Sequence, residues 1–179
     1  MSRIRRFVER HEDCFERSCL TGHLTASSWI ESARRDRFLL VHHRKLDRWL
    51  QLGGHADGHT DLAEVALREA REESGLDGFH FAPDPGGARL PFDVDVHRIP
   101  ATVAVGAHDH HDIRFLLVAD ELGPLRVSAE SHDVRWFDYE EADAVLKEES
   151  LWRMARKARG RKEDSRDSDL SAFPSKAFR

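Results

Sequence analysis

Three glutamates lie close together in one short charged segment: Glu69, Glu72 and Glu73. On a helix they occupy positions i, i+3 and i+4, so their carboxylates project from one face. Arg68, four residues before Glu72, can hold that carboxylate by an i,i+4 ion pair. Clustered anions repel one another unless a cation lies among them, and hard carboxylate oxygens suit Mg2+ or Mn2+. The spacing therefore predicts a divalent-cation site that also takes a phosphate.

The residues on either side of this segment are those expected at the ends of a helix. Gly54 belongs to a loop before it, Thr60 or Asp61 can cap the first turn, and Gly75 can end the last one. A charged run of this kind also fits an ordinary solvated helix face. The glycine loop before the run and the strand pattern on both sides favour the metal site over that alternative.

The segment from residue 54 to 76 resembles the Nudix box. The pattern of the box is Gly, five residues, Glu, seven residues, then Arg-Glu-apolar-x-Glu-Glu-x-Gly-apolar. The positions that match in register are Gly54, Arg68, Glu69, Ala70, Glu72, Glu73, Gly75 and Leu76. Thr60 stands where the family has its first glutamate, with Asp57 and Asp61 nearby, so that role is either dispensable here or filled by a neighbour.

The resemblance implies a hydrolase that uses Mg2+ (or Mn2+) to cleave a phosphoanhydride bond in a nucleoside diphosphate linked to another moiety. Water is then the nucleophile. The metal ligands that it implies are the carbonyl oxygen of Gly54 and the carboxylates of Glu69, Glu72 and Glu73. Glu73 and Glu69 are also the first two catalytic candidates, while Arg68 and Gly75 are expected to be structural.

A third catalytic carboxylate is expected outside the box, to bind a further ion or to deprotonate the attacking water. Glu130 is the candidate, because it lies in a loop just before an apolar strand and the family often supplies such a glutamate from this part of its fold. Asp133 and Glu121 are the alternatives, and an ordinary loop glutamate is the competing interpretation.

Histidines and aspartates form a second polar group. Asp93, Asp95 and His97 share one face of a predicted strand, and residues 108–112 read His-Asp-His-His-Asp before the next strand. The candidates for substrate or phosphate contact are His97, His110, Asp112 and Arg114, with Arg114 as a phosphate fork. A separate metal centre is a further interpretation. Trp29, Trp49 and Phe92 could stack on a base or pack in the core.

The order of elements indicates an α+β protein. Helices are predicted over 3–18, 60–75, 139–146 and 151–159, strands over 25–31, 37–42, 79–81, 94–99, 113–119 and 133–137, and a loop over 83–87. The resemblance covers residues 24–146 and implies an α/β/α sandwich around a mixed sheet, with an added N-terminal helix. The expected division is 1–22 as a helical extension, 23–147 as the Nudix domain, and 148–179 as a helix with a basic, partly disordered tail.

Composition limits the remaining possibilities. The chain has 179 residues, enough for one domain, and no apolar run long enough to cross a membrane. Cys14 and Cys19, expected on different faces of the first helix, read as reduced thiols of a cytoplasmic protein. The net charge of −5 conceals a basic tail, in which residues 151–179 carry nine Lys and Arg against four Asp and Glu.

Two rival functions stay open at this stage. A nucleotide-sensing module without catalysis would explain Thr60, although the intact Glu72-Glu73 pair opposes it. An RNA-end pyrophosphohydrolase would use the basic tail to hold RNA, whereas the scarcity of aromatic residues between Met154 and Leu170 favours a solvated extension. The expected partner is a nucleotide-type small molecule, and a homodimer is compatible with the sequence.

Overall fold

The computed structural model describes residues 3–82 and 88–171, with side chains as far as Arg161. Eight strands form a single mixed sheet in which β1 (Gly22–Ser32) and β7 (His108–Ala119) are parallel neighbours. The path through the sheet is β3-β2-β1-β7-β5, with β4 on β1, β6 on β7 and β8 on β2. The other strands are β2 (Arg37–His43), β3 (Arg48–Leu50), β4 (Leu52–His55), β5 (Phe79–Phe81), β6 (Asp93–Ile99) and β8 (Ser131–Asp138).

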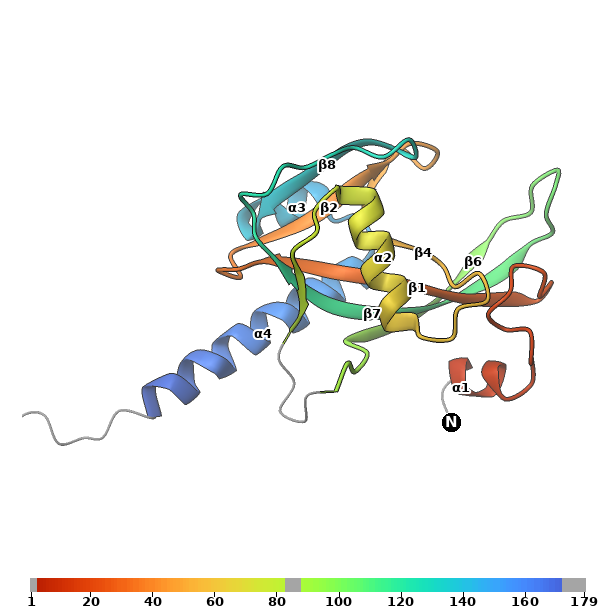
Figure 1. Ribbon diagram of the computed structural model, residues 1–179, viewed down its shortest axis with the longest axis horizontal. Helices are drawn as coiled ribbons and strands as arrows, with labels where there is room; N and C mark the ends of the chain where they lie inside the picture. The colour runs from red at the N-terminus through yellow and green to blue at the C-terminus, as the bar shows by residue number, and fades with distance from the viewer. Residues whose placement is uncertain (1–2, 83–87, 172–179) are drawn as a thin grey trace, which may run out of the picture.

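Helices cover both faces of this sheet, as expected for an α/β/α sandwich (Figure 1). Alternate residues of β1 point to opposite faces. Leu24 and Ala26 pack with residues of α2 (Leu62–Ser74), whereas Trp29 packs with Leu151 and Met154 of α4 (Glu149–Ser171). The predicted fold class is therefore confirmed. The box helix α2 lies on one face of β1 and the C-terminal helix on the other.

The N-terminal helix is much shorter than predicted. α1 spans only Arg3–Val8, and the chain then continues through turns to β1. Cys14 and Cys19 are free and buried in the same core cluster as Phe7, so the prediction that they point to different faces is wrong. The carbonyl of Cys14 accepts a hydrogen bond from Leu24 N at 2.7 Å, which turns the segment back onto the sheet instead of letting the helix continue.

Other boundaries also differ from the sequence prediction: several strands and the last helix are longer, and the helix predicted over 139–146 is shorter. β1 and β7 begin at Gly22 and His108, three and five residues earlier than predicted, because polar residues there pair in register with the neighbouring strand. The predicted helix over 139–146 is a 3-10 turn (Tyr139–Glu141) followed by α3 (Ala142–Val145). α4 continues as a helix to Ser171, well into the tail predicted to be partly disordered.

Two predictions fall outside the described residues, namely the loop over 83–87 and the end of the tail over 172–179. Within residues 3–82 and 88–171, no helix is long and apolar enough to span a membrane.

Candidate functional site

Helix α2 carries the acidic segment and has well-defined ends. Asp61 is its N-cap, since its carboxylate accepts hydrogen bonds from Ala63 N at 3.1 Å and Glu64 N at 3.2 Å. Thr60, the alternative cap, is exposed and lies one residue before the cap. Gly75 ends the helix in the left-handed conformation, with φ of 73°, which favours glycine because it has no Cβ. The structural role predicted for Gly75 agrees with this geometry.

Glu73 is the most deeply buried glutamate of the acidic face. Its Oε2 accepts a hydrogen bond from Gly53 N at 2.8 Å, which joins the helix to β4, the strand that contains Gly53 and Gly54 instead of the predicted loop. Burial raises the pKa of Glu73 to about 8, and the charges of Glu69, Glu130 and Glu72 add to that rise against the lowering effect of the Gly53 hydrogen bond. The Glu73 side chain is therefore held in place by the backbone, and no cation among the described side chains forms an ion pair with it.

Glu69 lies against the same strand, at Gly54. Arg68 Nη2 donates to Glu69 Oε1 at 2.8 Å and to the carbonyl of His55 at 3.2 Å. The predicted pair of Arg68 with Glu72 is thus replaced by one with Glu69, because the His55 carbonyl draws the guanidinium toward β4. A Cβ on Gly54 would come within 2.6 Å of the Glu69 carboxylate oxygens, so a side chain there would displace that carboxylate. Burial raises the pKa of Glu69, partly offset by Arg68.

The other two candidate glutamates, Glu72 and Glu130, are more exposed than Glu69 and Glu73. Glu72 is exposed, and Glu130 is an exposed loop residue whose charge raises the pKa values of both Glu69 and Glu73. The carbonyl of Glu130 accepts from Arg44 N at 2.9 Å, so the loop is anchored at the end of β2. The structure thus brings together the four glutamates that the sequence singled out.

The alternatives to Glu130 have other surroundings. Asp133 accepts a hydrogen bond from Val134 N at 2.8 Å, within β8. Glu121 lies 4.0 Å from Arg34 and follows β7. Glu130 is the one of the three whose charge reaches the glutamates of α2, which agrees with its choice as candidate.

This acidic centre fits a divalent cation. Its donors are carboxylate oxygens, the type that Mg2+ and Mn2+ prefer. Two of the carboxyls, Glu69 and Glu73, have pKa values raised by burial and by neighbouring anions, so a bound cation would relieve both effects. The residues that would hold it are Glu69, Glu72, Glu73 and the carbonyl of Gly54.

Arg114 and Asp112 are placed differently from the prediction. The Arg114 side chain is only 2% exposed and faces three carboxylates, at 2.8 Å from Asp112, 3.4 Å from Asp95 and 3.6 Å from Asp93. Asp112 also accepts hydrogen bonds from Thr25 and Ser27. We therefore revise the expected roles. Both side chains are occupied by an internal ion-pair network, and the phosphate fork predicted for Arg114 has no open face.

The other predicted contacts divide into two groups. His97 is partly exposed and lies 3.5 Å from Asp95, while His110 is half-buried among other histidines. Trp29 is fully buried in the core, and Trp49 packs edge-on against Phe137. A stacking role for Trp29 is therefore excluded by burial.

Two neighbours of the site were missed by the sequence analysis. Arg17, from the segment before β1, binds Asp57 in the loop before α2, with Nη2 to Oδ2 at 2.6 Å. His55 directly follows Gly54 and lies 5.0 Å from the ring of His23. The signal available for His55 was its place in the box loop, whereas the long separation of Arg17 from Asp57 in the chain left no local pattern.

Comparisons with known proteins agree with this geometry. A model of the NUDIX domain family matches residues 22–158. Among solved structures, a NUDIX family hydrolase from Clostridium perfringens has a TM-score of 0.61 at 22% identity, covering 76% of this chain and 96% of that one. A C. elegans Ap4A hydrolase has a TM-score of 0.58 at 17% identity, covering 84% of this chain and 98% of that one. The E. coli dihydroneopterin triphosphate pyrophosphohydrolase has a TM-score of 0.53 at 17% identity, covering 76% of this chain and 92% of that one.

At these identities the solved structures show a shared fold alone. A search of curated proteins found no match. The family match, by contrast, covers most of the chain and includes the whole acidic segment and both strands that flank it. The chain therefore belongs to the NUDIX domain family.

Proposed function

We propose that this protein is a hydrolase dependent on Mg2+ or Mn2+ that cleaves the phosphoanhydride bond of a nucleoside diphosphate linked to another moiety. The observation that carries the proposal is the charge imbalance at α2. The charges of Glu72 and Glu130 help to raise the pKa values of Glu69 and Glu73, and Arg68 is the one cation hydrogen-bonded to these four glutamates among the described residues. Such a centre is suited to a divalent ion and a diphosphate.

The residues of the site have distinct parts in this reaction. Gly53 N fixes the carboxyl of Glu73, and Arg68 fixes that of Glu69, so both ligands are positioned before any ion arrives. A divalent ion bound there would neutralise diphosphate oxygens and lower the pKa of its water. Positioning and electrostatics of this kind supply most of the rate in phosphoryl-group chemistry.

Glu130 is suited to accept the proton of the attacking water. The water oxygen forms the new bond to phosphorus, the anhydride P–O bond breaks, and the leaving phosphate oxygen keeps the electron pair. Glu130 comes from a loop anchored to β2 through Arg44 N, and its exposed side chain can reach a water beside the α2 carboxylates. Service as a further ligand is the alternative role.

The class of substrate rests on analogy with proteins of the same fold. The names of similar structures include an Ap4A hydrolase and a NUDIX domain of Shewanella oneidensis NrtR complexed with ADP ribose. Both compounds contain a nucleoside joined through phosphoanhydride bonds to a second moiety. We propose a nucleotide of that type as the substrate, while the homodimer stays a prediction.

The contacts of α4 bear on the RNA-end alternative. Arg153 and Lys157 bind Asp93, Arg156 binds Glu149, and the Arg159 guanidinium lies 5.4 Å from the ring centre of Tyr139. Much of the basic cluster described by the structure is therefore engaged within the protein. This favours a small nucleotide over RNA, and Thr60 stays the single argument for a sensor.

A substrate panel tests the proposed function. Purified protein is incubated with nucleotide sugars, ADP-ribose, dinucleoside polyphosphates, nucleoside triphosphates and capped RNA, with Mg2+, with Mn2+ and with chelator. We expect cleavage of at least one nucleoside diphosphate derivative with either ion and none in chelator. Full activity in chelator would overturn the mechanism, and inactivity on the whole panel would favour the sensor.

The Glu130→Gln variant tests the part assigned to that loop. A base or a ligand acts mainly in the transition state, so we expect kcat to fall about 100-fold or more while KM changes little. Glu121→Gln is the matched control, because that loop carboxylate lies beside Arg34. A change confined to KM would assign Glu130 to substrate binding instead.

A further inference from the structure

Five histidines gather on one face of the sheet, at the ends of four strands. Register places His23 of β1 opposite His110 of β7, and His110 opposite His97 of β6. Residues directly opposite in a sheet point to the same face. His108 lies two residues before His110, and His55 of β4 lies opposite Thr25, two residues after His23. We call these five residues, His23, His55, His97, His108 and His110, the histidine cluster.

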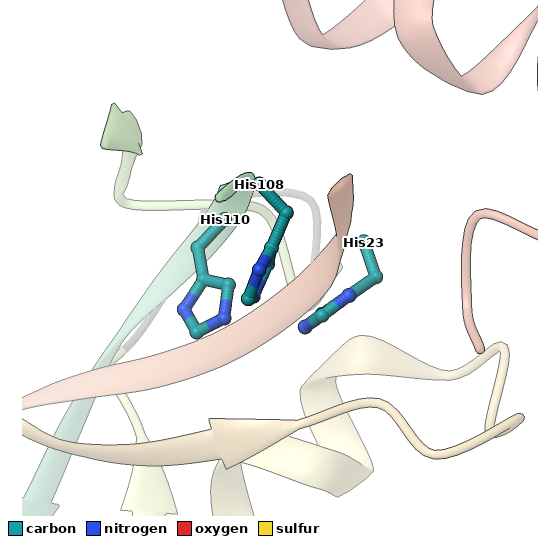
Figure 2. A group of neighbouring side chains, drawn as sticks. All are labelled: His23, His108 and His110. Carbon is teal, nitrogen blue, oxygen red and sulfur yellow. The ribbon is translucent and has the colours of Figure 1, made fainter. Parts of the chain in front are cut away.

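Three of them are arranged as metal ligands. One ring nitrogen from each of His23, His108 and His110 lies within 4.8 Å of the other two. Figure 2 shows the three imidazoles side by side, one from β1 and two from β7. Ligands at ~2.0–2.1 Å in tetrahedral geometry stand roughly 3.3 Å apart, so rotations of the rings would complete a site.

Three buried ring nitrogens of this group lack a hydrogen-bond partner among the described residues. His23 is 4% exposed, and neither of its ring nitrogens has a partner at normal hydrogen-bond geometry among the described residues, although the Cys19 backbone is near enough to act on its pKa. His110 Nε2 also lacks a partner. A buried polar atom without a partner costs roughly 1–3 kcal/mol, and each such atom in a native structure needs an explanation. A ligand shared by these nitrogens would provide one.

His108 is oriented by its surroundings. Its Nδ1 lies 2.9 Å from the carbonyl of Gly106, which can only accept, so Nδ1 carries the proton and Nε2 keeps its lone pair. Metal-binding histidines are commonly fixed by such a bond on the other nitrogen. His55 offers a fourth imidazole, with ring centres 5.0 Å from His23 and 4.9 Å from His110.

Electrostatics around the cluster favour neutral imidazoles. Burial lowers the pKa of His110 to about 2, and it also lowers the pKa of His23. Neutral imidazole is the form that binds metals. Arg17, whose charge reaches His23 and His55, is itself paired with Asp57 at 2.6 Å.

We propose that His23, His108 and His110 bind a zinc ion, with His55 as the nearest candidate for a fourth ligand. Nitrogen ligands select zinc over magnesium, so this site is chemically distinct from the carboxylates of α2. The ion would tie together the first residues of β1 and β7. Through His55 it would also hold the strand that carries Gly54, and thereby stiffen the entrance to the acidic centre.

Binding is tested on the full chain, stripped of metal with chelator and then kept in excess Mg2+ to occupy the α2 carboxylates. We expect one Zn2+ per chain by calorimetry, and visible absorption typical of tetrahedral nitrogen ligation when Co2+ replaces it. Zn2+ at ~100-fold above its Kd should raise Tm by about 5–10 °C. Absence of zinc binding would overturn the proposal.

Variants then locate the site. His108→Asn and His23→Asn should each weaken zinc binding by about 100-fold or more and abolish the rise in Tm. His80→Asn is the control, since His80 is an exposed histidine on β5, and it should bind zinc like the wild type. Equal Tm in chelator for all three shows that the variants still fold.

A second group of ligand atoms, from His11, Asp13 and Cys19, is close enough to hold an ion. Loss of zinc binding in Cys19→Ser, with full binding in His108→Asn and His23→Asn, would overturn the assignment. Retained binding in Cys19→Ser would support it.

Discussion

Two acidic clusters lie within this domain and differ in what surrounds them. On α2, the buried carboxyls of Glu69 and Glu73 have raised pKa values. Under α4, burial also opposes the charge of Asp93, but hydrogen bonds from Arg153 and Lys157 outweigh it and lower its pKa. Hydrogen bonding to His97 comes first among the effects that lower the pKa of Asp95 to about 2. Chemically similar groups are thus shifted in opposite directions.

The two clusters differ in how far their negative charge is compensated by protein cations, and the less compensated cluster is the one suited to bind a cation. Arg114 lies within 3.6 Å of three aspartates, and Arg153 Nη2 reaches Asp93 Oδ2 at 2.7 Å, so the charges under α4 are satisfied internally. That cluster fastens α4 to β6 and β7. In the part of the chain that the structure describes, Arg68 is the single cation hydrogen-bonded to the α2 cluster. A divalent ion would supply the missing positive charge.

The largest expected effect is a loss of turnover when a charge is removed from the α2 cluster. Glu73→Gln keeps the shape and the hydrogen bond from Gly53 N but removes a charge. We expect turnover to fall about 100- to 1000-fold, in line with loss of a principal electrostatic group. Steady-state kinetics at saturating Mg2+ measures this. Glu64→Gln, on the exposed side of the same helix, is the control and should keep full activity.

The next effect concerns stability, from the compensated cluster. Asp93→Asn leaves the buried charge of Arg114 with one partner fewer, so the free energy of unfolding should fall by about 2–3 kcal/mol. Turnover per folded molecule should be retained. Urea unfolding provides the measurement, and Glu149→Gln, which breaks an exposed pair with Arg156, should cost less than about 1 kcal/mol. Equal losses in the two variants would contradict the contrast.

The two clusters should also produce opposite slopes of stability against pH. The pKa of Asp95 is depressed in the folded state, so its contribution is present above about pH 4 and is lost as pH falls toward 2. The pKa of Glu73 is raised to about 8, so without metal the free energy of unfolding falls as pH rises from about 4.5 to 8. Unfolding in chelator measures both slopes. Asp95→Asn should flatten the dependence of stability on pH below about pH 4. Glu73→Gln should flatten the dependence between about pH 4.5 and 8.

The smallest expected effect on stability comes from Asp61. Its carboxylate belongs to neither cluster and accepts hydrogen bonds from the backbone N–H groups of Ala63 and Glu64. Asp61→Ala should lower the free energy of unfolding by about 1 kcal/mol, whereas Thr60→Ala should change it by less than about 0.5 kcal/mol. Thr60→Glu restores the residue of the family pattern at an exposed position, and we expect little change in turnover. A large gain in rate would assign that position to the metal site.

The sequence predicted the local features of this molecule well. The box helix, its Gly75 cap and the gathering of Glu69, Glu72 and Glu73 on one face follow from spacing within a few turns. The order of elements indicated an α+β protein, and the resemblance to the Nudix fold implied the mixed sheet. Pairing between distant segments could not be read in this way. Arg114 looked like a phosphate ligand because the sequence does not show that Asp93 and Arg153 lie beside it.

The histidine cluster shows the same limit. His108 and His110 were noticed because they are neighbours in the chain, but His23 and His55 join them only through strand register. The early end of α1 likewise depends on a hydrogen bond from Leu24 to the Cys14 carbonyl, which links the turns to β1. The periodicity of apolar residues alone had predicted a helix as far as residue 18, whereas α1 ends at Val8.

Manganese binding tests the central claim most directly. Metal-free protein is titrated with Mn2+ and free ion is followed by electron paramagnetic resonance, for the wild type, Glu73→Gln and Asp93→Asn. The account predicts that the wild type and Asp93→Asn bind Mn2+ with the same affinity, and that Glu73→Gln binds it at least about 10-fold more weakly. Unchanged binding in Glu73→Gln, or binding lost in Asp93→Asn, would contradict it.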